Sequence, residues 1–102
     1  MITIKITEKS DYLRVEAEGH SLFEKKGKDI VCASVSVLLQ SWYLWEKELA
    51  GVDMKVELRS GYFNAILTCL NEKVLLFFYA LKLSLKIMEA QYPENIKLLR
   101  EE

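Results

Sequence analysis

Apolar and polar residues alternate along four short stretches of the chain, residues 2–8, 12–18, 53–59 and 62–68. A period of two is typical of strands with one buried face, and polar or glycine-containing breaks between such stretches are typical of turns. The pattern therefore predicts two hairpins. The positions expected to face the core are Ile2, Ile4, Ile6, Leu13, Val15, Ala17, Met54, Val56, Leu58, Phe63, Ala65 and Leu67.

Between the hairpins, from Ile30 to about Ala50, apolar residues recur at the spacing of an α-helix. Gly51 is placed to end this helix as a C-terminal cap. Both tryptophans of the chain lie on the apolar stripe, where we expect packing in the core or an interface rather than ligand binding. The expected stripe consists of Val31, Val35, Leu38, Trp42, Trp45 and Leu49.

A second helix is predicted over residues 72–91, between an N-cap at Asn71 and the stop at Pro93. Its apolar surface is wider than one stripe, so we expect it at the centre of the fold or in a partner interface. In the tail, the alternation of Ile96 and Leu98 with Lys97 fits either a short edge strand or a helical turn.

The order β-β-α-β-β-α predicts an α+β fold in a single domain, residues 1–102. Because every strand has one apolar and one polar face, we expect both helices to cover one face of a mainly antiparallel four-stranded sheet. The tail adds a fifth, short edge strand if it is extended. The uncovered polar face and the excess apolar helix surface together favour a homodimer.

The candidate chemistry lies between the first hairpin and the first helix. His20, the only histidine, follows Gly19 at the end of the second strand. If Asp29 caps the helix, Cys32 is the third helical residue, where the positive end of the helix dipole lowers a thiol pKa. We expect Cys32 and Ser36 on the flank of the stripe, with the sulfur accessible. A thiolate near an imidazole suits nucleophilic catalysis.

Taken alone, these residues also have ordinary structural explanations. A lone cysteine is more often a small buried hydrophobe, and a lone histidine is more often an ordinary surface residue. The charged segment 21–28 is either a solvated loop or a lid that orders over a bound peptide. Cys69 has neither a helix start nor a histidine beside it, so we expect a structural role for it.

The Gly19-His20 pair, the short loop and the run from Asp29 to Ser36 resemble the ribosomal-processing cysteine protease family, the Prp family. The Arg59–Tyr62 turn also fits, whereas Ser21 departs from the alanine expected there. The resemblance implies a substrate, the N-terminal extension of the large-subunit ribosomal protein L-twenty-seven, lying as an extended peptide across the histidine loop.

The resemblance also implies roles for the residues. The Cys32 thiolate attacks the scissile carbonyl, and His20 delivers a proton to the leaving amine. Gly19 and Ser36 match family positions and support the site. Asp29 either only caps the helix or also orients His20 as the third member of a triad.

Charge and composition exclude several other classes. A net charge of −1 gives little support for nucleic-acid binding. Two cysteines form no disulfide framework, and we expect no signal peptide and no membrane span, which indicates a cytoplasmic protein with reduced thiols. One histidine and two distant cysteines fall short of a zinc site, and no glycine-rich phosphate loop is present, so no metal or cofactor is expected.

Two competing functions stay open beside the protease. One is a non-enzymatic binding module of the same fold that acts in ribosome assembly, and the other is a thiol redox protein that uses Cys32 as a sensor. The presence of His20 and Asp29 together with Cys32 favours the protease over the first. The lack of a nearby resolving cysteine disfavours the second. A candidate peptide surface is the face with Tyr62, Asn64 and Thr68.

Overall fold

The computed structural model describes residues 1–19 and 30–101, and the structural statements below refer to this part of the chain. The predicted order of elements is confirmed, and the tail is a fifth strand. The elements are β1 (Ile2–Glu8), β2 (Leu13–Gly19), α1 (Ile30–Leu44), the π-helical turn η1 (Trp45–Leu49), β3 (Lys55–Arg59), β4 (Tyr62–Leu67), α2 (Glu72–Gln91) and β5 (Ile96–Glu101).

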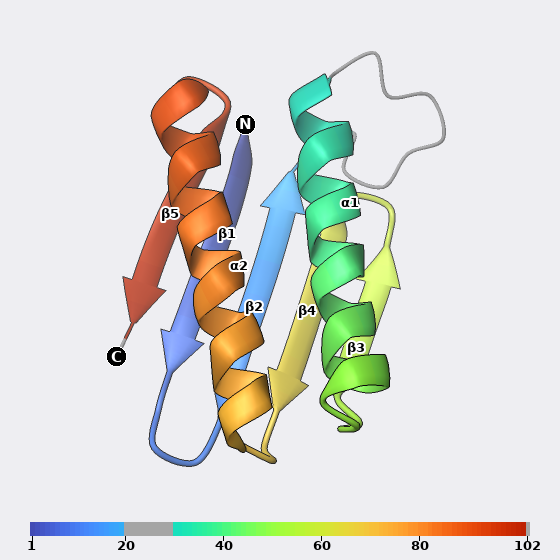
Figure 1. Cartoon of the computed structure of the whole chain (residues 1–102). Coiled ribbons are helices and arrows are strands. Elements are labelled where there is room, and N and C mark those ends of the chain that lie inside the picture. The colour runs from blue at the N-terminus through green and yellow to red at the C-terminus, as the bar shows by residue number, and fades with distance from the viewer. Residues whose placement is uncertain (20–29, 102) are drawn as a thin grey trace.

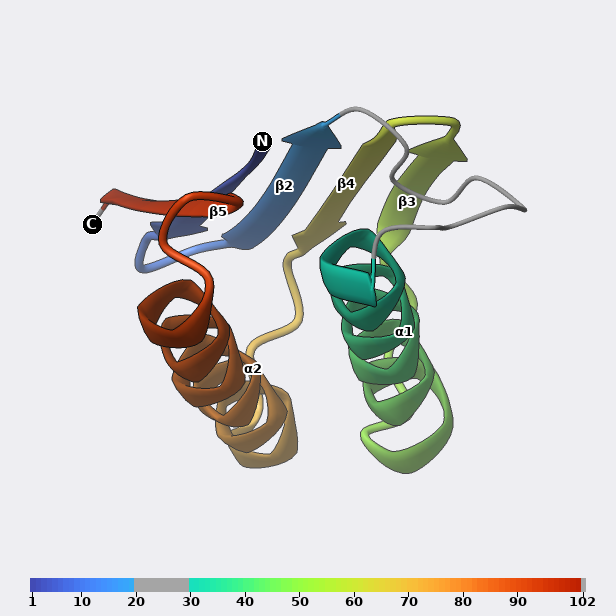
Figure 2. The same ribbon diagram turned by 90° about the horizontal axis from the view of Figure 1, so that it is seen from above.

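The strands form one mixed sheet in the order β3-β4-β2-β1-β5. The pairs β1–β2, β2–β4 and β3–β4 are antiparallel, and β5 is parallel to β1. Both helices cover the same face of this sheet, side by side (Figures 1 and 2). The predicted two-layer α+β fold is therefore confirmed, with β5 as the edge strand that the alternation in the tail allowed.

The core lies between the sheet and the two helices. The alternating residues of β1, β2 and β4 that were expected to face inward are all buried. Trp42 of α1 stands edge-on to Phe63 of β4, with ring centroids 6.4 Å apart. On α2, the buried helix surface consists of Val74, Phe78, Leu81 and Leu85. Period-two strands and period-3.6 helices thus meet along their apolar faces, as the sequence pattern requires.

Two of the positions expected to be buried are exposed. Leu58 of β3 is 51% exposed and Leu49 of η1 is 58% exposed. In the described sheet, β3 is an edge strand that pairs only with β4, so Leu58 has a neighbouring strand on one side alone. Leu49 lies in the last turn before the chain leaves the helix. The alternation predicted which way such residues point, and the position of their elements decided how well they are covered.

The first helix ends differently from the prediction. Its α-helical part stops at Leu44, and the next five residues form the π-helical turn η1, in which the Ala50 N–H donates to the Trp45 carbonyl oxygen at 3.1 Å. The predicted termination at Gly51 is confirmed, because Gly51 has φ +71°. Only glycine adopts this left-handed conformation without steric cost, which is why it follows so many helix ends.

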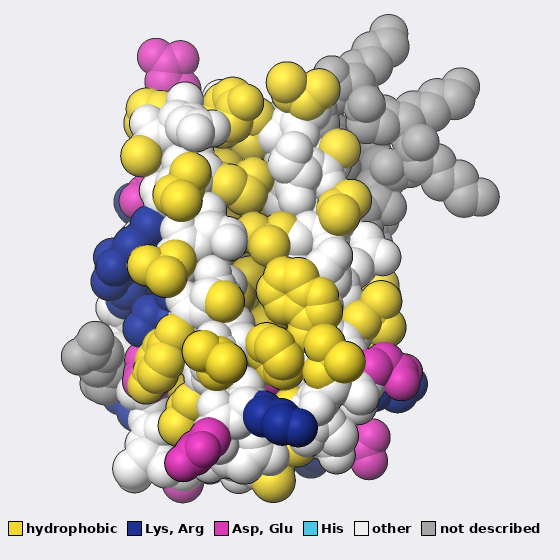
Figure 3. All heavy atoms as spheres, viewed as in Figure 1, with side chains coloured by type: hydrophobic (Ala, Val, Ile, Leu, Met, Phe, Trp, Pro, Cys, Tyr) yellow, Lys and Arg dark blue, Asp and Glu magenta, His cyan; other side chains and the backbone are white. Residues whose placement is uncertain are grey.

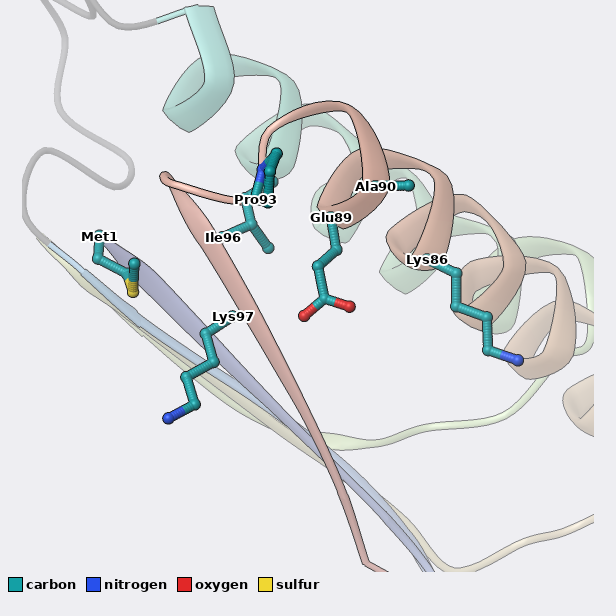
Figure 4. A pocket seen from close by; sticks show the side chains of 7 residues that line it. All are labelled: Met1, Lys86, Glu89, Ala90, Pro93, Ile96 and Lys97. Carbon is teal, nitrogen blue, oxygen red and sulfur yellow. The ribbon is translucent and has the colours of Figure 1, made fainter.

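The second helix and the tail are joined by a side chain. As predicted, Asn71 caps α2, and its Oδ1 accepts from the Val74 N–H at 2.9 Å. At the other end, Glu89 Oε2 accepts a 2.6 Å hydrogen bond from the main-chain N–H of Leu98 in β5. Figure 4 shows the Glu89 carboxylate directed from α2 toward the strand, with Lys86 and Lys97 on either side. This charge-assisted bond helps to hold the C-terminal strand against α2.

Apolar side chains remain exposed on the outer surface of the helix layer. Figure 3 shows them along both helices and between them. The large exposed ones on the two helices are Ile30, Val37, Leu44, Leu76, Tyr79, Leu83 and Ile87. The predicted excess of apolar surface on the second helix is therefore confirmed, and it faces outward. Contiguous apolar surface of this kind is typical of interaction sites.

Candidate active site

Cys32 lies in the first turn of α1. The helix begins at Ile30, so the cysteine is its third residue, as predicted. Its sulfur is thus close to the positive end of the helix dipole. Neither Cys32 nor Cys69, both of which lie in the described ranges, forms a disulfide.

The expectation that Cys32 is accessible was wrong. Its exposed fraction is 4%, and the neighbouring Val31 is 5% exposed. The helix face that packs on the sheet contains the row of Cys32, Ser36 and Leu39 as well as the row of Val31, Val35 and Trp42. The predicted stripe contained only large apolar residues, so it followed the row of Val31, Val35 and Trp42. The true buried face lies between the two rows.

Ser36 lies one turn after Cys32 and is also buried. Its Oγ donates a 2.8 Å hydrogen bond to the Cys32 carbonyl oxygen. A serine hydroxyl that bonds back to the preceding turn satisfies its own polarity inside an apolar layer. Ser36 thus bonds to the main chain of Cys32, which fits a supporting role. Ser34, by contrast, is exposed and makes the equivalent bond to the Ile30 carbonyl oxygen at 2.7 Å.

Gly19 ends β2 at a point where the chain has no room for a side chain. A Cβ on Gly19 would lie 2.9 Å from Ile2 Cα and 2.9 Å from the Met1 carbonyl oxygen. On its other side, the Gly19 N–H donates a 3.0 Å hydrogen bond to the Gly61 carbonyl oxygen in the β3–β4 turn. The end of β2 is therefore held between two neighbouring backbone segments.

The structure brings two of the predicted elements to one end of the molecule. The end of β2, at Gly19, and the start of α1, which carries Cys32, lie at the same end (Figures 1 and 2). The predicted catalytic His20, the predicted cap Asp29 and the proposed lid 21–28 lie outside the described residues. Of the five predicted site residues, the structure therefore places Gly19, Cys32 and Ser36.

The candidate peptide surface with Tyr62 and Asn64 lies on the opposite side of the sheet from α1, because these residues alternate with the buried Phe63 and Ala65. Tyr62 Oη donates a 2.8 Å hydrogen bond to Glu16 Oε2, which raises the pKa of Tyr62. Other polar groups of this face, such as Asn64, also bond to one another. The sheet thus separates this surface from Cys32.

Glu46 is a buried acidic residue that the sequence pattern did not reveal. Its side chain is 0% exposed, and its Oε2 accepts a 3.1 Å hydrogen bond from Trp42 Nε1. Within the described ranges, its Oε1 has no hydrogen-bond partner. Burial raises the pKa of Glu46 to about 7, and the Trp42 bond opposes this shift only in part. The available signal was the spacing of four residues from Trp42, which places both on one helix face.

Across residues 1–19 and 30–101, no group of three or more histidine, cysteine, aspartate or glutamate side chains is arranged to hold a metal ion. The same part of the chain has no helix that is both long and apolar enough to cross a membrane. The hollow beside Glu89, of about 420 Å³, lies between α2 and β5 and has no residue from α1 in its lining. The chemistry of the described site therefore rests on the single sulfur of Cys32.

Residues 1–97 match the sequence model of the family described as cysteine protease Prp. The chain belongs to this family. A Mycoplasma genitalium relative, a ribosomal processing cysteine protease Prp, is 45% identical over 42 residues, which is 41% of this chain. That match covers 40% of the relative's length.

Three solved structures are similar to nearly the whole chain. The essential ribosomal processing protease Prp from S. aureus, with a covalently linked product peptide, is 27% identical with a TM-score of 0.86, over 99% of this chain and 100% of that one. Its complex with a substrate peptide is 26% identical with a TM-score of 0.83, over the same shares. A Streptococcus mutans protein is 28% identical with a TM-score of 0.84, over 99% of this chain and 97% of that one. The Prp fold predicted from the sequence is thus confirmed.

Proposed function

We propose that this Prp-family chain, acting as one domain in the cytoplasm, is a cysteine endopeptidase that removes the N-terminal extension of a large-subunit ribosomal protein of the L-twenty-seven type. The observation that carries the proposal is the position of Cys32, in the first turn of α1 at the end of the molecule where β2 delivers the chain to His20. The helix dipole favours the thiolate there, and the proposal assigns His20 as its proton partner.

The relatives support this reaction class. The M. genitalium relative and the S. aureus protein are both ribosomal processing proteases. The S. aureus protein has been seen with a substrate peptide and with a covalently linked product peptide. Covalent attachment of a peptide is what nucleophilic attack by a cysteine produces.

The reaction assigned to these residues has two steps. The Cys32 thiolate adds to the scissile carbonyl, the carbon–nitrogen bond breaks as a thioester forms, and protonated His20 gives its proton to the departing amine. Water then attacks the thioester as neutral His20 takes a proton from it, and the carbon–sulfur bond breaks, which releases the carboxylic acid and restores the Cys32 thiolate with protonated His20. The positive end of α1 stabilises the oxyanion in both steps. Asp29 caps the helix or orients His20.

Burial of the sulfur sets a condition on this mechanism. At 4% exposure, Cys32 has to become more accessible before a peptide carbonyl reaches it. The same burial is the observation that favours the alternative, a non-enzymatic ribosome-assembly module that keeps the fold. In that alternative the purified protein binds the ribosomal protein without cutting it.

The test is cleavage of the ribosomal protein with its extension, followed by mass spectrometry. We expect Cys32→Ala to abolish cleavage while retaining binding, because alanine removes only the nucleophile from an already buried site. Cys69→Ala is the matched control, since Cys69 is exposed and lies in the β4–α2 connection. Cleavage by Cys32→Ala, or binding without cleavage by the unmodified protein, contradicts the proposal.

We also propose that the protein is a homodimer formed through its helix layer. A shallow groove of about 480 Å³ along the outer side of α1 is lined by small and apolar residues. Its lining is Ala33, Ser34, Val37, Leu38, Ser41 and Trp45. On the same surface, α2 exposes Leu76, Leu83 and Ile87. In the proposed dimer, a two-fold axis places the α2 of each copy on the α1 groove of the other. The same chain therefore supplies both the groove and the apolar side chains that fill it.

The dimer is tested by sedimentation equilibrium. Leu83→Lys places a charge in the centre of the proposed interface and is expected to yield monomers. Leu99→Lys is the control, because Leu99 is exposed on β5, where it alternates with the inward-facing Ile96 and Leu98. A monomeric unmodified protein, or Leu83→Lys that remains dimeric, contradicts this interface.

A further inference from the structure

The β3–β4 turn is tied directly to the strand end that leads into His20. The Gly61 carbonyl oxygen accepts the 3.0 Å hydrogen bond from the Gly19 N–H. Gly61 has φ +75°, and a Cβ added to it would lie 3.1 Å from the Gly19 carbonyl oxygen. Gly61 therefore contacts both ends of the Gly19 residue, one through a hydrogen bond and one through close packing.

The turn is itself anchored to the sheet. The Arg59 guanidinium lies 4.3 Å from the centroid of the Tyr62 ring, which closes the turn across its base. The Tyr62 hydroxyl donates to Glu16, which lies in β2 three residues before Gly19. The turn is thus attached to β2 both at Gly19 and at Glu16, and this double attachment restricts movement of one against the other.

On its other side, Gly19 pairs with Ile2 of β1. A Cβ added to Gly19 would lie only 2.9 Å from the backbone atoms of both Ile2 and Met1. Backbone, unlike the end of a flexible side chain, gives way only when the strand shifts. Gly19 therefore lies in a slot between β1 and the β3–β4 turn.

We propose that Gly61 is a positioning residue, which sets the direction in which the chain leaves Gly19 and hence the place of the His20 imidazole relative to the Cys32 sulfur. This rests on the proposed function, because it assigns a role to Gly61 through His20. The peptide unit is planar, so the orientation of the Gly19 carbonyl determines the direction of the next Cα, 3.8 Å away. A displacement of about 1 Å in a catalytic group is enough to lower a rate about a hundredfold.

A matched pair of glycines tests this proposal. Gly51 and Gly61 have nearly the same positive φ, 71° and 75°, but a Cβ on Gly51 has no heavy atom within 4 Å. Alanine at either position carries the same backbone strain, and only Gly61→Ala presses on the Gly19 carbonyl. Gly61→Asn separates backbone strain from the contact with Gly19. Asparagine tolerates a positive φ, and its Cβ makes the same contact with the Gly19 carbonyl oxygen as the Cβ of alanine.

Three readouts are compared in a Cys69→Ala background: urea stability, kcat for extension cleavage, and the pH dependence of Cys32 alkylation by iodoacetamide. We expect both alanine variants to lose stability, and Gly61→Ala to lose at least as much as Gly51→Ala. We expect Gly51→Ala to keep its kcat, and Gly61→Ala and Gly61→Asn to lose at least tenfold. Their alkylation profiles should shift toward that of His20→Ala.

The proposal is overturned if Gly61→Ala and Gly51→Ala keep the same kcat and alkylation profile. Failure of the proposed function has a different signature, because the unmodified protein then shows no cleavage and His20→Ala leaves the alkylation profile unchanged. A kcat that falls for Gly61→Ala but recovers for Gly61→Asn also overturns it, since backbone strain rather than the Gly19 contact is then the cause.

Discussion

The hydroxyl of Ser36 bonds to the carbonyl oxygen of Cys32, one helical turn earlier, at 2.8 Å. The bond lies in the buried face of α1, so it stabilises the turn that carries the sulfur. A residue in this place affects catalysis through the position of the helix backbone.

Ser36→Ala should therefore have a small effect. We expect a loss of about 0.5–1.5 kcal/mol in the free energy of unfolding, typical for one intramolecular hydrogen bond, and a fall in cleavage of less than tenfold. Ser34→Ala, which removes the equivalent exposed bond to Ile30, should change stability by about 0.5 kcal/mol or less. Urea unfolding and cleavage assays measure both. Abolished cleavage with normal stability in Ser36→Ala would give the hydroxyl a chemical role.

Gly19→Ala should destabilise the fold. The added Cβ meets the Ile2 and Met1 backbones at 2.9 Å, so the end of β2 has to separate from β1. We expect a cost of about 1–3 kcal/mol, as for overpacked cores. Gly19→Ala should also lose more cleavage activity than a variant that is equally destabilised at a distant place. Asn71→Ala at the α2 cap is such a variant. Unchanged urea stability of Gly19→Ala would show that the slot between β1 and the β3–β4 turn is loose.

Glu46 predicts a pH dependence of stability. Its folded-state pKa of about 7 is above its ordinary value of 4.5, so the folded state retains a proton that the unfolded chain releases between these values. The contribution of Glu46 to the free energy of unfolding is therefore greatest below pH 4.5. This contribution falls as the pH rises through 7.

Glu46→Gln should remove this dependence. The glutamine oxygen still accepts from Trp42 Nε1, and no charge develops at high pH, so we expect a gain of about 1–2 kcal/mol at pH 8 and little change at pH 5. Thermal unfolding at the two pH values measures the difference. Parallel stability curves for the variant and the unmodified protein would contradict the assignment.

The bond from Leu98 to Glu89 predicts a local effect in the tail. Glu89→Ala should cost about 1–3 kcal/mol, because it leaves a strand N–H without its charged acceptor, whereas Glu89→Gln retains an oxygen and should cost less. Hydrogen exchange at Leu98 should accelerate more in the alanine variant than exchange in the β2–β4 ladder. Equal acceleration in both places would argue against a local role for this bond.

Much of the fold follows from the sequence because its determinants are local. Alternation at Ile2–Ile6 and Phe63–Leu67 depends only on the period of a strand, and the N-cap at Asn71 and the stop at Gly51 depend only on the backbone around them. The place of Cys32 in its helix is local in the same sense. Membership of the Prp family was likewise recognised from the motif around His20 and Cys32 and confirmed by comparison over residues 1–97.

The sequence by itself therefore determined the elements, their apolar faces, and the helix turn that holds the candidate nucleophile. Only the tertiary structure decided that β5 lies parallel beside β1, that Leu58 stays exposed, and that Cys32 and Glu46 are covered. The reason is that burial is a property of what packs against a side chain. A polar or small residue such as Ser36 or Glu46 carries no apolar signal of its own, and its position inside the core is set by neighbours far away in the chain.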